Sequence, residues 1–385
     1  MDYWKLVACI YEIAFGLILY IVASIMIYIG IRGIKINKGK KKNIYGSIST
    51  LICGISWVFF GIYNSFVNLF TYPFDGFMVW WIGIIFIIFA SFGLLVRKVS
   101  HSADFKEAMS SDQELSKIEL FIKKIRRKET YKEEIPIKME IIRKSFHLTG
   151  LVFIFAYFGC FSIPPLAIIA NRGINVIIHW TEPVYNVLWG DISNYPYPID
   201  SIEAINAIAT LGLVGAFFFM INSDLIRVLW GPEYSIFHFL TKSTLRNEEY
   251  EAVGPQIYLI TGAIFGYVLY LIGIIDILSY IAGLSCSCIS DALAALVGRI
   301  WGDKDVNCRG GRKKTVEGFI AGTGSAFVFC LIFVGPIYAI IGTLIFLLID
   351  YLSFHISDNI LNPIFIPLAI RIFYWIIQIP IGWSL

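Results

Sequence analysis

The sequence predicts an all-α integral membrane protein, a polytopic helical bundle of about ten transmembrane helices. The chain has 385 residues, of which 57% are hydrophobic and only 15% carry a charged side chain. A water-soluble domain carries about 25% charged residues, so this composition excludes a soluble globule, a disordered chain and a coiled coil. Apolar segments recur along the chain, and nearly all basic residues lie in alternate connections between them.

Ten segments are apolar enough to cross a bilayer as helices, which takes roughly 20 residues each. The first is too long for the hydrophobic part of a signal peptide and lacks a basic start, so a cleaved leader is not expected. In chain order, the expected spans are residues 6–31, 44–70, 78–96, 147–169, 204–222, 257–275, 278–298, 316–334, 335–352 and 363–383.

The basic residues predict the orientation of these spans. Of the 31 lysine and arginine residues, 28 lie in four connections that fall on the same side of a ten-span chain. Basic connections stay on the cytoplasmic side of a membrane. We therefore expect both termini outside and four connections in the cytoplasm, at residues 32–43, 97–147, 222–256 and 299–314.

One long polar stretch divides the chain into three predicted parts. Residues 101–134 are rich in serine and in charges of both signs, which is typical of a solvated cytoplasmic linker beside a membrane. This linker separates a three-span N-terminal unit, residues 1–100, from a seven-span unit, residues 135–385, that contains the candidate site.

The start of the fourth span carries three basic side chains close together. Arg143 lies four residues and Lys144 three residues before His147, so a helix brings both cations near the imidazole. Ionisable groups at membrane depth are costly and indicate function, and two cations with an imidazole can bind phosphate. The alternative is a membrane anchor with a hydrogen-bonded histidine at the interface.

The fifth and seventh spans each carry an unexpected aspartate. Asp224 and Arg227 are three residues apart at the end of the fifth span, where they either take part in chemistry or neutralise each other as a structural ion pair. Asp291 lies in an apolar stretch whose small residues, from Ala292 to Gly298, let helices approach closely. Packing does not account for this aspartate, whereas a hard cation with oxygen ligands does.

The connection before the eighth span has the composition of a phosphate cradle. Two glycines precede Lys313 and Lys314, and Thr315 is placed to cap the next helix, whose N-terminus attracts anions. Glu317 follows Lys313 by about one helical turn. The Gly-Lys-Thr order of a Walker A loop is absent, and no strand is expected before the helix. The alternative is an ordinary basic loop on the cytoplasmic side.

A short polar turn precedes the tenth span on the predicted basic side, yet it contains no base. Its Asp358 and Asn359 offer the oxygen ligands that Mg²⁺ prefers. The alternative is an Asx turn that leads into Pro363.

These five groups all fall on one predicted membrane face. Cations for phosphate and separate carboxylates for a metal ion are what phosphoryl or nucleotidyl transfer requires. A transporter of a phosphorylated solute would more typically place such residues near the bilayer midplane, in broken helices.

The motifs, in this order, resemble those of the CTP-dependent lipid kinases, namely dolichol kinase, phytol kinase and the yeast-type diacylglycerol kinase. The phosphatidate cytidylyltransferases are more distant relatives of that family. The resemblance covers about residues 135–385, and this chain has Ser290 and Ser357 where the family commonly has glycine and aspartate. It rests on Arg143-Lys144-x-x-His147, Asp224-x-x-Arg227, Ser290-Asp291-Ala292-x-Ala294-Ala295-x-x-Gly298, Lys313-Lys314-Thr315-x-Glu317-Gly318 and Asp358-Asn359.

The resemblance implies a phosphotransferase that moves the γ-phosphoryl group of CTP to a membrane lipid alcohol at the cytoplasmic face. A polyprenol or dolichol is the expected acceptor, Mg²⁺ the expected cofactor, and no nucleic-acid partner is expected. Catalytic roles are implied for His147, Asp224 and Asp291, and metal binding for Asp291, Asp358 and Asn359. Nucleotide binding is implied for Arg143, Lys144, Arg227, Lys313, Lys314, Thr315, Glu317 and Gly318.

Two other functions stay open on the sequence. A CTP-dependent cytidylyltransferase that makes a CDP-lipid from a phosphatidate-like acid would use the same nucleotide and metal ion. A membrane transporter or a scaffold would consume no nucleotide.

Overall fold

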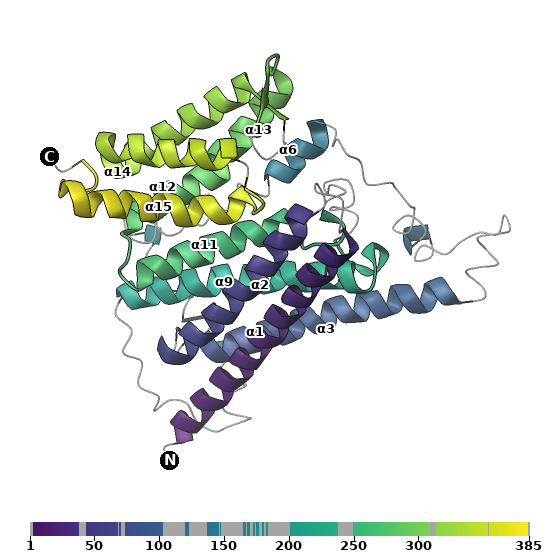
Figure 1. Cartoon of the computed structure of the whole chain (residues 1–385). Helices are drawn as coiled ribbons and strands as arrows, with labels where there is room; N and C mark the ends of the chain where they lie inside the picture. Colours follow the sequence, from purple (N-terminus) through teal and green to yellow (C-terminus); the bar gives the residue numbers. More distant parts are fainter. Residues whose placement is uncertain are drawn as a thin grey trace.

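Figure 1 shows the computed structural model of the chain, a bundle of long helices. It describes residues 3–37, 44–67, 69–70, 74–102, 120–122, 137–145, 147, six residue pairs between 165 and 183, 201–237, 249–308, 313–352 and 354–383. The α-helices are α1 (Tyr3–Ile36), α2 (Ile44–Val67), α3 (Phe74–His101), α6 (Ile137–Ser145), α9 (Ser201–Leu229), α11 (Pro255–Leu271), α12 (Ile277–Ser285), α13 (Asp291–Ile300), α14 (Val316–Leu352) and α15 (Asp358–Ile377).

The described residues confirm a multi-pass helical membrane protein. Seven helical segments are long and apolar enough to cross a bilayer, and α11 is a shorter apolar helix. The expected count of ten spans stays a prediction, because the fourth expected span lies almost entirely outside the described residues. The seven segments are Leu6–Ile36, Ile44–Val67, Phe74–His101, Ala209–Leu229, Ile277–Ile300, Val316–Leu352 and Asp358–Ile377.

The long helix α14 is a hairpin of two helical limbs. Gly335 interrupts it with φ 79° and ψ 173°, and Pro336 follows. Only glycine adopts this backbone readily, and proline cannot continue the hydrogen bonds of the preceding turn. Figure 1 shows the chain folding back on itself here. The expected boundary between spans 316–334 and 335–352 is therefore confirmed, and both ends of the hairpin lie on one face of the protein.

The last helix begins earlier than the sequence suggested, at Asp358 instead of Pro363, so both Pro363 and Pro367 lie inside α15. Each proline deprives the carbonyl four residues earlier of its helical partner. These are the carbonyls of Asn359 and Pro363, and each faces a glycine of α11. A Cβ atom would lie 2.6 Å from Asn359 O at Gly262 and 2.5 Å from Pro363 O at Gly266. Because these glycines have no side chains, α11 and α15 can touch at the two turns of α15 that end at Pro363 and Pro367.

The N-terminal and C-terminal units share one hydrophobic core. Trp57 of α2 stacks on Phe217 of α9, with ring centroids 3.7 Å apart. The indole N–H of Trp57 donates to the hydroxyl of Thr261 on α11 at 3.1 Å. Buried aromatic side chains contribute large apolar areas, so these contacts join the two units firmly. The predicted division into three parts is not tested by them.

Among the described residues, three features depart from the purely α-helical expectation, one of them the short 3₁₀-helix η2 (Pro232–Tyr234) after α9. A two-stranded antiparallel hairpin, β1 (Asp305–Asn307) and β2 (Lys313–Thr315), joins α13 to α14. The expectation that no strand precedes this helix is wrong, because β2 runs directly into it. A π-helix, η4 (Cys286–Ser290), separates α12 from α13.

We predict that Gly262→Ala lowers the free energy of unfolding by about 1–3 kcal/mol, because the new methyl group must push α15 away from α11. Thermal unfolding of the purified protein in detergent measures this change. The matched control is Gly16→Ala in α1, where a Cβ atom meets nothing within 4 Å and alanine favours the helix. Equal melting temperatures for the two variants would contradict the close approach of α11 and α15.

Candidate functional site

Three aspartates meet where the ends of several helices converge. Asp291 begins α13, Asp350 lies in the last turn of α14, and Asp358 begins α15. One carboxylate oxygen from each lies within 4.8 Å of the others. We call these three residues the acidic cluster. Like charges this close repel, so the cluster needs cations beside it.

Two lysines from different parts of the chain supply these cations. Lys144, at the end of α6, donates a hydrogen bond from Nζ to Asp291 Oδ2. Lys314, on β2, donates from Nζ to Asp350 Oδ1. Burial opposes the charge on Lys314, but the carboxylates of Asp350 and Asp358 raise its pKa above the usual value. Two ammonium groups thus face three carboxylates.

The π-helix helps to present Asp291. Residues 286–290 are almost entirely buried and lie directly before it. A π-turn takes in one residue more than an α-turn and rotates all that follows, a feature found often at functional sites. Beyond the cluster, α13 packs on α14 through Gly298 and Gly318, where a Cβ atom at Gly318 would lie 2.7 Å from Ala294 O. The prediction that small residues let these helices approach closely is confirmed.

A further group of ion pairs surrounds Arg143 of α6. Its guanidinium lies 3.8 Å from Glu140 and 3.7 Å from Glu249, and Arg299 of α13 lies 3.4 Å from Glu140. Burial opposes the charge of Arg143, but Glu249 and Glu140 raise its pKa above the usual range. Ion pairs therefore hold α6 in two places: Glu140 pairs with Arg299 of α13, and Arg143 pairs with Glu249.

His147 follows α6 and is buried beside the acidic cluster. Its Nδ1 atom lies 4.0 Å from Asp291 Oδ2 and has no hydrogen-bond partner among the described residues. The structure therefore brings Arg143, Lys144 and His147 together at this end of the bundle, although not on one helix as expected, because α6 ends at Ser145 and His147 lies in the turn that follows.

Asp224 and Arg227 form a separate buried ion pair. Asp224 Oδ1 accepts a hydrogen bond from Arg227 Nε at 2.7 Å, and its Oδ2 accepts one from the backbone of Gly254. Arg227 also donates to the carbonyls of Glu249 at 3.2 Å and Ala252 at 2.6 Å. The structure thus contains the ion pair that the sequence offered as the alternative to a role in chemistry. The pair holds the 249–254 turn in place. The catalytic role for Asp224 and nucleotide binding by Arg227 stay untested predictions.

Residues in and next to the β-hairpin have two structural roles: one caps α14 and another supports the loop before β1. Thr315 caps α14 as predicted, because its hydroxyl accepts from Gly318 N at 3.2 Å. Glu317 accepts from the backbone of Asp303 at 3.1 Å and thereby ties the hairpin to the helix. Lys313 pairs with Asn307 across the strands, and its side chain lies outside the described residues.

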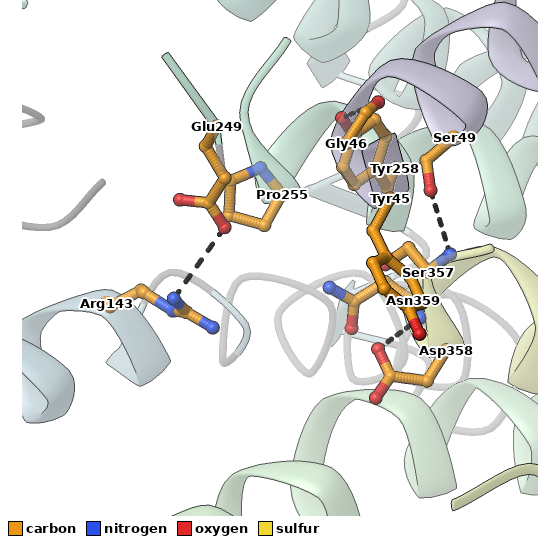
Figure 2. Close-up of a pocket in the computed structure, with 10 residues that line it drawn as sticks. All are labelled: Tyr45, Gly46, Ser49, Arg143, Glu249, Pro255, Tyr258, Ser357, Asp358 and Asn359. Carbon is orange, nitrogen blue, oxygen red and sulfur yellow. Dashed lines mark hydrogen bonds and ion pairs between the residues drawn. The ribbon is translucent and has the colours of Figure 1, made fainter. Parts of the chain in front are cut away.

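The start of α15 faces a polar pocket that Figure 2 shows. Asn359 N donates to Asp358 Oδ1 at 3.0 Å, and both residues belong to the first turn of α15, so the alternative of an Asx turn before Pro363 is wrong. The side-chain oxygen of Asn359 is buried and has no hydrogen-bond partner among the described residues. A buried carbonyl oxygen without a donor is costly, so this position suits an added cation or donor.

Sequence reasoning missed three acidic residues of this region. Asp350 completes the acidic cluster, and Glu140 and Glu249 surround Arg143. The signal for Asp350 was present, since it is a carboxylate at the predicted cytoplasmic end of a very apolar span. The signal for Glu249 was weak, because it lies in a polar connection where charge is ordinary.

No family model, no curated protein and no solved structure matches this chain. The resemblance to the lipid kinases therefore stays an expectation carried by the motifs. The function has to be argued from the arrangement of the site.

We predict that Lys144→Met lowers the free energy of unfolding by about 3–5 kcal/mol, because it leaves the buried carboxylate of Asp291 without its cation. The double variant Lys144→Met/Asp291→Asn should recover part of the loss. The control is Lys138→Met, an exposed lysine on the same helix. Denaturant unfolding in mixed micelles measures all three, and similar losses for Lys138→Met and Lys144→Met would contradict the prediction.

Proposed function

We propose that the chain is a Mg²⁺-dependent kinase that transfers the γ-phosphoryl group of CTP to a membrane lipid alcohol, with a polyprenol as the expected acceptor. One observation carries the proposal: three carboxylates lie within 4.8 Å of one another, and a buried lysine, Lys144, and a half-buried one, Lys314, contact them. This combination suits a metal-bound polyphosphate better than either a bare cation or a bare anion. The choice of CTP and of a polyprenol rests on the family resemblance.

The donor set fits Mg²⁺, which prefers oxygen ligands. Asp291, Asp350 and Asp358 would hold the ion, whereas Asn359, whose side-chain oxygen is buried without a partner among the described residues, lines the adjoining polar pocket. The bound ion would neutralise negative charge on the phosphoryl oxygens.

The basic residues would bind the phosphates. Lys144 and Lys314 neutralise the carboxylates of the acidic cluster, and their ammonium groups can pair equally with phosphate oxygens. Arg143 lines the polar pocket together with Asp358 (Figure 2), where its planar guanidinium can contact a second phosphate. Phosphoryl transfer depends mainly on such positioning and charge.

His147 would orient the acceptor. The lipid hydroxyl attacks the γ-phosphorus, a new O–P bond forms, and the bond to the β-phosphate oxygen breaks to release CDP. The hydroxyl proton needs an acceptor during this step. The buried Nδ1 of His147, 4.0 Å from Asp291 Oδ2, is placed to take a hydrogen bond from that hydroxyl.

The membrane setting supports a lipid substrate. The site lies at the ends of apolar helices, so an alcohol in the bilayer can approach while the nucleotide arrives from water. The asymmetry of basic residues, 28 of 31 on one predicted side, supports a cytoplasmic position for the site.

We predict that purified protein in polyprenol-containing nanodiscs transfers label from γ-labelled CTP to a polyprenyl phosphate when Mg²⁺ is present. Label from α-labelled CTP in a CDP-lipid, with phosphatidate as acceptor, would instead assign the cytidylyltransferase function. Solute flux into sealed vesicles without nucleotide consumption would assign a transporter.

We predict that Asp350→Asn lowers kcat about a hundredfold or more, the scale for loss of one charge-stabilising group in an active site. Binding of Mn²⁺, followed by electron paramagnetic resonance, should weaken in parallel. The control is Asp276→Asn at the N-cap of α12, because asparagine caps helices as well as aspartate does. Equal effects of the two variants would contradict a metal role for Asp350.

A further inference from the structure

The polar pocket beside the acidic cluster has a wall from the N-terminal unit, which lies outside the family resemblance. Figure 2 shows Tyr45 and Ser49 of α2 on the side opposite Arg143 and Glu249. Asp358 belongs to both the pocket lining and the acidic cluster. A ligand whose charged end lies at the cluster can therefore extend into the pocket.

Several hydrogen bonds fix the first turns of α2 at this place. Ser357 N donates to Ser49 Oγ at 2.9 Å, and Tyr258 OH donates to the Gly46 carbonyl at 2.8 Å. The ring of Tyr45 stacks on His355, with centroids 4.6 Å apart and planes inclined by 2°. The bonds connect α2 to α11 and to the turn before α15, so the wall is an ordered part of the site.

The chemistry of the lining indicates the kind of ligand. Hydroxyls, an amide, two carboxylates and a guanidinium surround the space (Figure 2), and the buried oxygen of Asn359 lacks a donor among the described residues. A lipid chain would require an apolar lining. Ribose hydroxyls and the polar edge of a base match a lining of carboxylate, amide and hydroxyl groups.

We propose that this pocket binds the nucleoside part of the phosphate donor, so that the N-terminal unit is part of the nucleotide site. The inference rests on the proposed function, which places the phosphates at the acidic cluster. Glu249 and Asn359 would accept hydrogen bonds from the nucleoside, and α2 would close the pocket on the opposite side. Residues 1–100 then help to select the nucleotide in addition to anchoring the protein.

The test separates the nucleoside from the phosphates. Binding of labelled MgCTP to the full-length protein in nanodiscs is measured directly, and inorganic tripolyphosphate serves as a competitor that has phosphates but no nucleoside. Ser49→Phe places a bulky ring in the pocket in the space of the nucleoside, so it should weaken CTP binding about tenfold or more, which is about 1.4 kcal/mol or more of binding free energy. The inhibition constant of tripolyphosphate should stay unchanged.

Two further variants test whether a folding defect, and not the loss of pocket space, causes the weaker binding. Ser65→Phe places the same side chain at an exposed position near the other end of α2 and should bind both ligands like the wild type. Glu249→Gln keeps the shape of the pocket and should weaken CTP binding, whereas tripolyphosphate should bind as tightly or more tightly, because Arg143 loses its ion pair with Glu249.

Three results would overturn the inference: unchanged CTP binding in both pocket variants, equal loss of CTP and tripolyphosphate, or an increased KM for polyprenol alone, which would assign the pocket to the acceptor. Binding does not depend on transfer. Selective loss of CTP binding in a protein that transfers no phosphate would support the pocket and reject the kinase, whereas transfer with unaffected pocket variants would reject the pocket alone.

Discussion

Pairing of two lysines with buried aspartates holds one face of this membrane protein together. Lys144 binds Asp291 and Lys314 binds Asp350, so α6, α13, the β-hairpin and both ends of the α14 hairpin meet at one place. Buried ion pairs contribute little net stability compared with apolar packing, but an unpaired buried charge is strongly destabilising. The pairs therefore act mainly by excluding other arrangements of these helices, and the same charges are available to a polyphosphate.

The apolar part of the bundle supports this face through close backbone contacts. Two carbonyls of α15 lose their helical partners because of Pro363 and Pro367, and they pack against the glycines of α11. This contact fixes the start of α15, where Asp358 lies. The ion pair of Asp224 and Arg227 fixes the 249–254 turn on the other side of the pocket. Packing inside the membrane thus determines where the polar groups stand at its surface.

The sequence was sufficient wherever the signal is local. Apolar length predicted the helices and the division of residues 316–352 into two spans, the cost of a lone charge pointed to Asp291, and a polar turn with oxygen ligands pointed to Asp358. Pairing between distant segments was not predictable, because many cations share the predicted face and only the fold selects Lys144 for Asp291. Asp350 was not predicted as a site residue, although it is a carboxylate at the end of a very apolar span. The start of α15 was misplaced because proline usually ends or begins a helix, whereas here a neighbouring helix accommodates it.

The order of charges along the chain has a consequence for biosynthesis. A membrane protein is made from its N-terminus, and a carboxylate that enters the bilayer without a partner is costly. Lys144 precedes Asp291, and Lys314 precedes Asp350. Each of these acids therefore emerges from the ribosome after its counter-ion has been made. The lysine that neutralises each aspartate is then already present when the helix that carries the aspartate inserts.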